Sequence, residues 1–118
     1  MSRPEEIQQE FLALIDSHLD DLVHQRATEM LEVEDFAEQL HIHPTHFSNT
    51  IKKLTGTSPC GLYQPKILAV AQQLLAQPEL QIKTIALRLS FEPSQFTKWF
   101  KQLSGTTPKA YRAQILKS

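Results

Sequence analysis

Two stretches of the sequence repeat each other at a separation of 49 residues. Residues 33–59 read VEDFAEQLHIHPTHFSNTIKKLTGTSP, and residues 82–108 read IKTIALRLSFEPSQFTKWFKQLSGTTP. The copies align without a gap, and the identical pairs are Ala37/Ala86, Leu40/Leu89, Pro44/Pro93, Phe47/Phe96, Lys52/Lys101, Leu54/Leu103, Gly56/Gly105, Thr57/Thr106 and Pro59/Pro108. Solenoids usually need about three or more repeats, so two copies favour the duplication of one small module.

The apolar spacing within each copy predicts two short helices separated by a tight turn. Phe36, Ala37 and Leu40 have helical spacing, the period breaks at Ile42, and it restarts at Phe47. The residues of the restarted period are expected to face the core: Phe47, Ile51 and Leu54 in the first copy, and Phe96, Phe100 and Leu103 in the second.

Proline, glycine and hydroxyl residues predict where these helices begin and end. Pro44 suits the first turn of a helix, where no amide hydrogen is needed. Gly56 is typical of the left-handed residue that ends a helix, and Ser58 before Pro59 predicts the N-cap of a further helix. The equivalents in the second copy are Pro93, Gly105 and Thr107-Pro108. Each copy therefore predicts a helix, a turn, a second helix, a stop and a third helix.

Apolar stripes outside the copies predict further helices. A first helix is expected from about Pro4 to Asp21, and the stretch 22–31 is either its continuation or a short separate helix. A connecting helix is expected between the copies, in which Pro65 either causes a kink or marks the true start. The prediction is an all-α fold of about seven helices, with a first unit over residues 1–58, a linker helix over 59–76 and a second unit over 77–118.

The net charge of −1 conceals two oppositely charged parts. Residues 1–40 hold two basic and eleven acidic residues, a net charge of −9, whereas residues 41–118 hold ten basic and two acidic residues, a net charge of +8. This separation indicates a polyanion as the partner of the second part. An alternative function is a helical protein-interaction module that docks through its acidic N-terminal helix.

Other function classes find little support in the sequence. There is no Gly-rich phosphate loop and no nucleophile motif, so an enzyme is not expected. His41, His43 and His46 form a His-x-His-x-x-His pattern, but we assign it no fourth ligand and expect neither a metal nor another cofactor. Cys60 is the only cysteine and is expected to be a small buried residue. Without a signal peptide or a membrane span, a cytoplasmic location is expected.

The two helix-turn-helix units, the helical linker and the Gly-Thr-Ser/Thr-Pro stops resemble the AraC/XylS family of bacterial transcription regulators. The most specific stretch, IALRLSFEPSQFTKWFKQLSGTTPKAYRAQ, includes the closing Thr107, Pro108, Tyr111 and Arg112, and the resemblance covers roughly residues 11–112. It implies sequence-specific binding of double-stranded DNA and regulation of transcription, with recognition helices over about 44–55 and 93–104 in successive major grooves. Where the family usually has glycine in each turn, this chain has His41 and Ser90, so strained left-handed residues are expected there.

The resemblance also implies partners and contact residues. RNA polymerase is a further candidate partner, as is an effector-sensing or dimerisation domain, for which 118 residues leave no room, so the sequence is either a short regulator or a fragment. Trp99 is expected to pack against the linker helix. The expected base contacts are Thr45, His46, Ser48 and Asn49 in the first unit and Ser94, Gln95, Thr97 and Lys98 in the second, and the expected phosphate contacts are Lys52, Lys53, Lys101 and Arg112.

Overall fold

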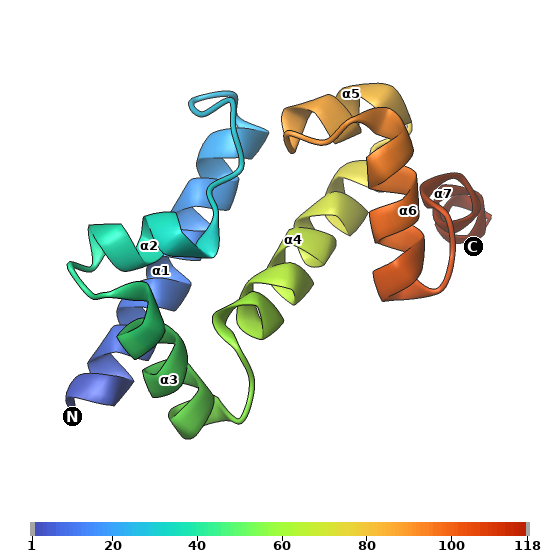
Figure 1. The fold of residues 1–118 in the computed structure, drawn as a ribbon. Coiled ribbons are helices and arrows are strands. Elements are labelled where there is room, and N and C mark those ends of the chain that lie inside the picture. Colours follow the sequence, from blue (N-terminus) through green and yellow to red (C-terminus); the bar gives the residue numbers. More distant parts are fainter. Residues whose placement is uncertain (1, 118) are drawn as a thin grey trace.

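The computed structural model describes residues 2–117, which form seven α-helices and no β-strand (Figure 1). The helices are α1 (Arg3–Val23), α2 (Val33–Gln39), α3 (Pro44–Thr55), α4 (Pro59–Leu75), α5 (Ile82–Arg88), α6 (Pro93–Ser104) and α7 (Pro108–Leu116). Helix α4 runs obliquely between a first unit, α1–α3, and a second unit, α5–α7 (Figure 1). The predicted all-α fold with two helix-turn-helix units joined by a helix is confirmed.

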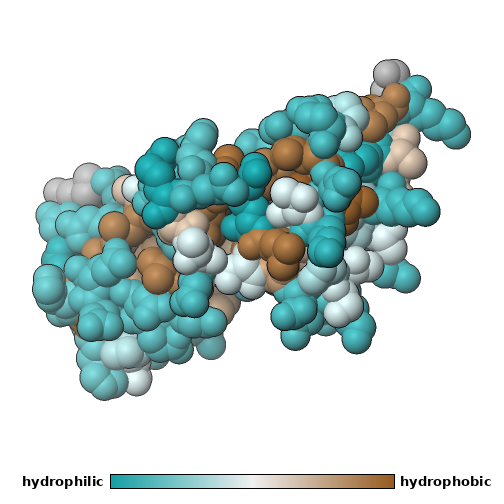
Figure 2. Space-filling model, turned by 90° about the horizontal axis from the view of Figure 1, so that it is seen from above, coloured by the Kyte–Doolittle hydropathy of each residue, from teal (hydrophilic) through white to brown (hydrophobic). Residues whose placement is uncertain are grey.

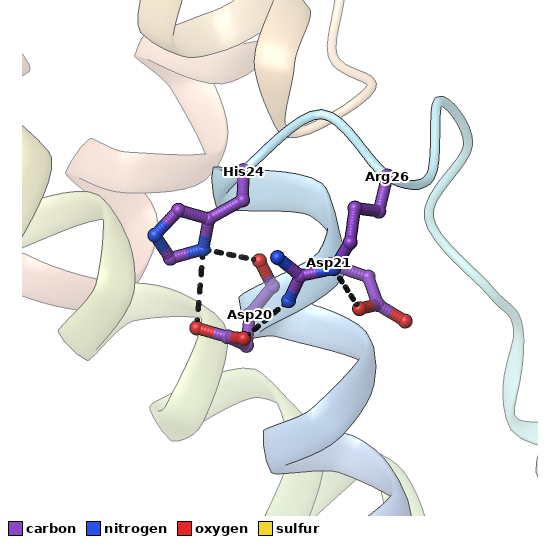
Figure 3. Close-up of polar contacts among 4 residues, drawn as sticks. All are labelled: Asp20, Asp21, His24 and Arg26. Atoms are coloured by element: carbon purple, nitrogen blue, oxygen red, sulfur yellow. Dashed lines mark hydrogen bonds and ion pairs between the residues drawn. The ribbon is translucent and has the colours of Figure 1, made fainter.

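Helix α1 ends at Val23, and residues 24–32 contain no helix. Both sequence-based alternatives for residues 22–31 are therefore wrong, because α1 gains only two residues beyond Asp21 and no separate helix follows. Arg26 bends back and donates hydrogen bonds to the carboxylates of Asp20 and Asp21, while His24 Nδ1 lies 3.2 Å from Asp20 Oδ1 (Figure 3). These exposed contacts link the first residues after α1 to its last turn. We name residues 24–32 the α1–α2 segment.

The first hydrophobic core lies among α1, α2, α3 and the N-terminal half of α4. Phe11 is fully buried at its centre, with its ring centroid 5.5 Å from that of Phe36 and 4.9 Å from that of Phe47, both in edge-to-face geometry. Such pairs add specificity of orientation to the burial of apolar surface. The buried members are Ile7, Phe11, Ile15, Leu19, Leu22, Phe36, Ala37, Phe47, Ile51, Tyr63 and Ile67.

Two buried polar side chains hold the α1–α2 segment against this core. His18 Nε2 accepts a hydrogen bond from the Leu31 amide at 2.9 Å, and the Tyr63 hydroxyl donates to the Leu31 carbonyl at 2.9 Å. Burial lowers the pKa of His18, against the opposing effect of Asp21 and Asp35. Burial also raises the pKa of the Tyr63 phenol far above its usual range. Both groups therefore stay neutral, and both polar groups of the Leu31 backbone are satisfied.

The second core lies among α5, α6 and the C-terminal half of α4. Its buried members are Ala71, Leu74, Leu75, Ile85, Ala86, Leu89, Phe96 and Phe100. Tyr111 of α7 covers this core, with its ring centroid 5.6 Å from that of Phe100. Helix α4 thus supplies Tyr63 and Ile67 to the first core and Ala71, Leu74 and Leu75 to the second. One helix is a structural part of both units.

The molecule is elongated, with principal extents of 46, 28 and 24 Å. Hydrophilic residues cover most of the face in Figure 2, and hydrophobic residues appear there in separate patches, the larger ones near the middle. Cys60 is exposed near the start of α4, so the expectation that it is buried is wrong: the buried residue at this turn is Pro59. Within residues 2–117, no helix is long and apolar enough to cross a membrane.

Candidate nucleic-acid interface

The turn between the two short helices has the same backbone geometry in both units. His41 and Ser90 adopt left-handed conformations, with φ of 58° and 73°. In the first turn the amide of Ile42 donates to the Ala37 carbonyl at 3.0 Å, and in the second the amide of Phe91 donates to the Ala86 carbonyl at 2.8 Å. The expected strain at these non-glycine residues is therefore present in both turns. Each turn thus joins its two helices through a left-handed residue and an equivalent hydrogen bond.

The second helix of each unit also begins and ends alike. Pro44 and Pro93 occupy the first helical position of α3 and α6, as predicted. Gly56 and Gly105 end these helices with φ of 81° and 85°, in the left-handed region that glycine tolerates without strain. The hydroxyl of Thr55 donates to the Ile51 carbonyl, and that of Ser104 donates to the Phe100 carbonyl, both at 2.8 Å. These equivalent contacts give α3 and α6 the same length.

The burial pattern determines which face of α3 and α6 is available to a ligand. Phe47 and Ile51 of α3 are fully buried, as are Phe96 and Phe100 of α6. The expected base-contact residues lie away from these side chains: Thr45, His46, Asn49, Ser94, Gln95, Thr97 and Lys98 are exposed, and Ser48 is half-buried. Each helix therefore presents a polar surface from its N-terminal half.

The inward-facing stripe is shorter than the sequence predicted. Leu54 and Leu103 are 40% and 44% exposed to solvent, so the expectation that they face the core is wrong. Both residues lie in the last turn of their helix, about one turn beyond Ile51 and Phe100, the last buried residues of the two helices. Helical periodicity keeps them near the same face, but the core does not extend to that turn.

The expected phosphate contacts separate into two groups. Lys52, Lys53 and Lys101 are exposed in the last turn of α3 or α6. Arg112 instead binds within the molecule: its Nε donates to the Leu75 carbonyl at 2.9 Å, and its Nη2 donates to the Gln77 carbonyl at 3.2 Å. These carbonyls lie at and just after the end of α4, so Arg112 attaches α7 to the linker helix.

The N-termini of α3 and α6 differ in their caps. His43 Nδ1 accepts a hydrogen bond from the Thr45 amide at 3.1 Å, whereas Glu92 at the equivalent position of α6 makes no side-chain cap bond. The side chain of His43 therefore helps to fix the first turn of α3. Glu34 and Glu38 of α2 line a surface hollow together with His41 and His43. These carboxylates were not recognised from the sequence as neighbours of the histidines. Within residues 2–117, no group of three or more His, Cys, Asp or Glu side chains is arranged to hold a metal ion.

Trp99 packs against the linker helix, as predicted. Its Nε1 donates a hydrogen bond to Gln64 Oε1 of α4 at 2.6 Å, and its ring lies 4.8 Å from that of Phe91, centroid to centroid. The sequence alone indicates no role for Gln64. A half-buried amide facing an indole N–H has no periodic signature, so only the fold could reveal this pair.

Comparisons with known proteins agree with this architecture. A family model described as a helix-turn-helix domain matches residues 36–114. The C-terminal domain of AraT, a response regulator from Geobacillus stearothermophilus, is 29% identical over 96% of this chain and 88% of its own, with a TM-score of 0.79. No curated protein sequence matches the chain.

Two further solved structures share the fold. The DNA-binding domain of AdpA, a global transcriptional factor solved in complex with a target DNA, is 26% identical over 81% of this chain and 90% of its own, with a TM-score of 0.65. A transcriptional regulator with an AraC-type DNA-binding domain from Chromobacterium violaceum is 23% identical over 93% of this chain and 92% of its own, with a TM-score of 0.75.

Fold, turn geometry and exposed helix faces define the class of protein: a double helix-turn-helix domain for sequence-specific DNA binding in transcription regulation. The chain belongs to the AraC-type helix-turn-helix family, whose model matches more than half of its length. This is a family of regulator domains and not of enzymes.

Proposed function

We propose that one copy of this chain reads two successive major grooves of double-stranded DNA, with α3 in one groove and α6 in the next. The observation that carries this proposal is the occurrence of two equivalent helix-turn-helix modules at the two ends of a single shared helix, α4. Adjacent grooves on one face of a duplex are about 34 Å apart. The 17 residues of α4 span about 25 Å, and the flanking helices add to this separation.

In this proposal the N-terminal halves of α3 and α6 read the bases. Asn49 and Gln95 each carry an amide that can bind adenine through two hydrogen bonds, and Lys98 can bind guanine. Thr45 can place its methyl group against that of thymine. The other base contacts are proposed at His46, Ser48, Ser94 and Thr97.

The exposed lysines would position the protein on the sugar-phosphate backbone. Lys52, Lys53 and Lys101 lie near the C-terminal ends of the two helices, away from the base-reading turns. Contacts to phosphate fix register but carry no sequence information. We do not retain Arg112 among these contacts, because its guanidinium already donates to the Leu75 and Gln77 carbonyls.

The proposed site is asymmetric. The two modules are joined in tandem and differ at their reading positions, where the first has Asn49 and the second has Lys98. Footprinting with a monomeric preparation tests this directly, on duplexes selected by the protein from a random pool. We expect one chain to protect about two helical turns of a non-palindromic site. Protection of a palindrome by a dimer alone would contradict the proposal.

A protein-interaction module that never binds DNA makes a different prediction. If about three to six cations contact phosphates, log K should fall with log salt at a slope of about −0.9 per contact. A slope near zero would favour the interaction module. Contact with RNA polymerase and an effector-sensing or dimerisation domain stay predictions from the family resemblance, and location in the cytoplasm stays a prediction from the sequence.

A further inference from the structure

Trp99 departs from the internal repeat at a position where the two units should otherwise be equivalent. The residue 49 positions earlier is Thr50. Thr50 lines a shallow surface hollow with Pro4, Lys53 and Leu54, all within the first unit. Trp99 is half-buried and packs against the buried residues of both cores. The module itself does not require a tryptophan here, so the role of Trp99 concerns the relation between the units.

Trp99 belongs to a small cluster that connects the two units. Met30 of the α1–α2 segment, Val70 of α4 and Phe91 before α6 also pack against both cores. Gln64 adds the hydrogen bond from Trp99 Nε1, and its equivalent on α7 is Ala113, which has no side-chain acceptor. We name Met30, Gln64, Val70, Phe91 and Trp99 the inter-unit joint. Through it, α6 is attached both to the linker helix and to a segment of the first unit.

The joint is adjacent to a residue proposed to read DNA. Gln95 and Trp99 lie four residues apart on α6 and therefore on neighbouring turns of one helix face. Both line a groove of about 320 Å³, which Met30, Leu31 and Glu32 of the α1–α2 segment also line. A rotation of α6 that displaced the indole of Trp99 would displace Gln95 with it. The orientation of α6 for base reading is thus coupled to the contact between units.

We propose that Gln64 and Trp99 are positioning residues that fix the rotation of α6 relative to α3 and thereby select the number of base pairs between the two half-sites. This inference rests on the proposed reading of two grooves by one chain. Each base pair inserted between half-sites moves the second one by about 3.4 Å and turns it by about 35°. A domain with a fixed joint tolerates such a change poorly, because either the DNA or the joint must deform.

The test measures affinity against half-site spacing. Duplexes selected by the wild-type protein from a random pool are remade with one or two base pairs inserted or removed between the two protected blocks. We expect the wild type to lose about tenfold or more in affinity per base pair of change, and Gln64→Leu and Trp99→Phe to lose less than about threefold. Both variants should bind a duplex with a single half-site with the same affinity as the wild type. Gln73→Leu, an exposed glutamine of the same helix, is the matched control and should behave as the wild type.

The outcomes separate this inference from the proposed function. If the wild type has no preferred spacing, the reading of two grooves by one chain is wrong, and the joint has no such role. If the wild type prefers one spacing and both variants keep that preference equally sharply, two-groove reading stands and the inference is wrong. Trp99→Phe retains an aromatic ring and removes the indole donor, so it keeps the test valid if Gln64→Leu does not fold.

Discussion

The first and second units contain the same module but are supported differently. In the first unit the module packs against α1, a helix of 21 residues, and the core has eleven buried residues. The second is covered by α7, a helix of nine residues, and its core has eight. The repeated residues, such as Pro44/Pro93 and Gly56/Gly105, account for the helix ends and lengths that the units share. The residues that differ account for what each module packs against.

The segments that precede the two modules, residues 24–32 and 76–81, also differ. The α1–α2 segment has nine residues, tied down through Leu31 by His18 and Tyr63. Only six residues connect α4 to α5. Arg112 of α7 binds the carbonyl of Leu75 at the end of α4 and that of Gln77 in this connection. Tyr63 and Arg112 are 49 residues apart, so equivalent positions perform the same task with different chemistry. A duplicated module can therefore keep a contact while its side chains change.

The largest expected effect on stability comes from removing a buried phenylalanine ring from either core. Phe47→Ala and Phe96→Ala each remove a fully buried ring, which costs about 3–5 kcal/mol of unfolding free energy. Because α4 belongs to both cores, we expect the units to unfold together in both variants. Urea titrations followed by circular dichroism and by fluorescence of Trp99, the single tryptophan, should give coincident transitions. Separate transitions would mean that the units are independent.

Base reading should divide between the units. Asn49→Ala is expected to relax the preference at one or two base pairs of one half-site, and Gln95→Ala to do so in the other, at about 1–3 kcal/mol each. Lys53→Ala is the control, because loss of a phosphate contact should weaken binding to all sequences about equally. Competition among single-base variants of a selected duplex measures this. Loss of preference in the same half-site for both variants would contradict the division.

Acid sensitivity should arise in the first unit. Because burial lowers the folded-state pKa of His18, the unfolded state binds a proton more readily. The stabilisation is therefore fully present above the unfolded pKa of about 6.5 and is lost as the pH falls below it. His18→Leu should cost about 1–3 kcal/mol, because the Leu31 amide loses its acceptor, and should flatten this pH dependence. An unchanged slope between pH 7 and 5 in urea titrations of the variant would contradict this assignment.

The N-caps of α4 and α7 should contribute unequally to the free energy of unfolding, although their hydrogen bonds are alike. Ser58 accepts from the Gly61 amide at 3.2 Å, and Thr107 accepts from the Ala110 amide at 3.1 Å. We expect Ser58→Ala to cost about 1 kcal/mol, since α4 serves both cores, and Thr107→Ala to cost less, since α7 can fray locally. Urea titrations of the two variants test the order. A greater loss in Thr107→Ala would contradict it.

The smallest expected effect is a gain in stability at the turns. A left-handed L-residue costs about 1–2 kcal/mol, and glycine loses about 0.5–1 kcal/mol more backbone entropy on folding, so His41→Gly and Ser90→Gly should each stabilise by about 0.5 kcal/mol. His41→Ala and Ser90→Ala keep the strain and are the controls. Thermal melts of the four variants give the comparison. Destabilisation by either glycine would show that the side chain contributes more than its strain costs.

Much of this architecture could be predicted because local chemistry determines it. Pro44, Gly56 and Ser58 each restrict the backbone at one position, and the same restrictions recur 49 residues later. Burial of Cys60 was predicted from its residue type alone, and this prediction was wrong. The prediction for Leu54 was wrong for another reason. Helical spacing gives the side on which a residue lies but not how far the neighbouring helix extends, and that extent decides whether a side chain is buried.

Residues that act between elements were the hardest to predict. The packing of Trp99 on the linker helix was predicted, but its hydrogen-bond partner Gln64, 35 residues away, was not. The binding of Leu31 by His18 and Tyr63, which joins three separate segments, was not predicted either. Such contacts depend on how whole helices pack and leave no periodic trace. The polar faces of α3 and α6 were easier to predict, because burial of Phe47 and Phe96 fixes which side chains must point outward.

The dual membership of α4 limits how this architecture can be re-engineered or diversified. Inserting one residue between Ile67 and Ala71 would turn everything that follows by about 100° and advance it by about 1.5 Å. The second half of the protein would then face another direction, with its interior intact. Length changes should therefore be tolerated at the exposed residues 28–29 and 78–79, which lie outside these contacts, but not in this helix. A chimera with a related regulator must be joined within α4 at equivalent positions. A flexible fusion would lose the fixed orientation of the two modules relative to each other.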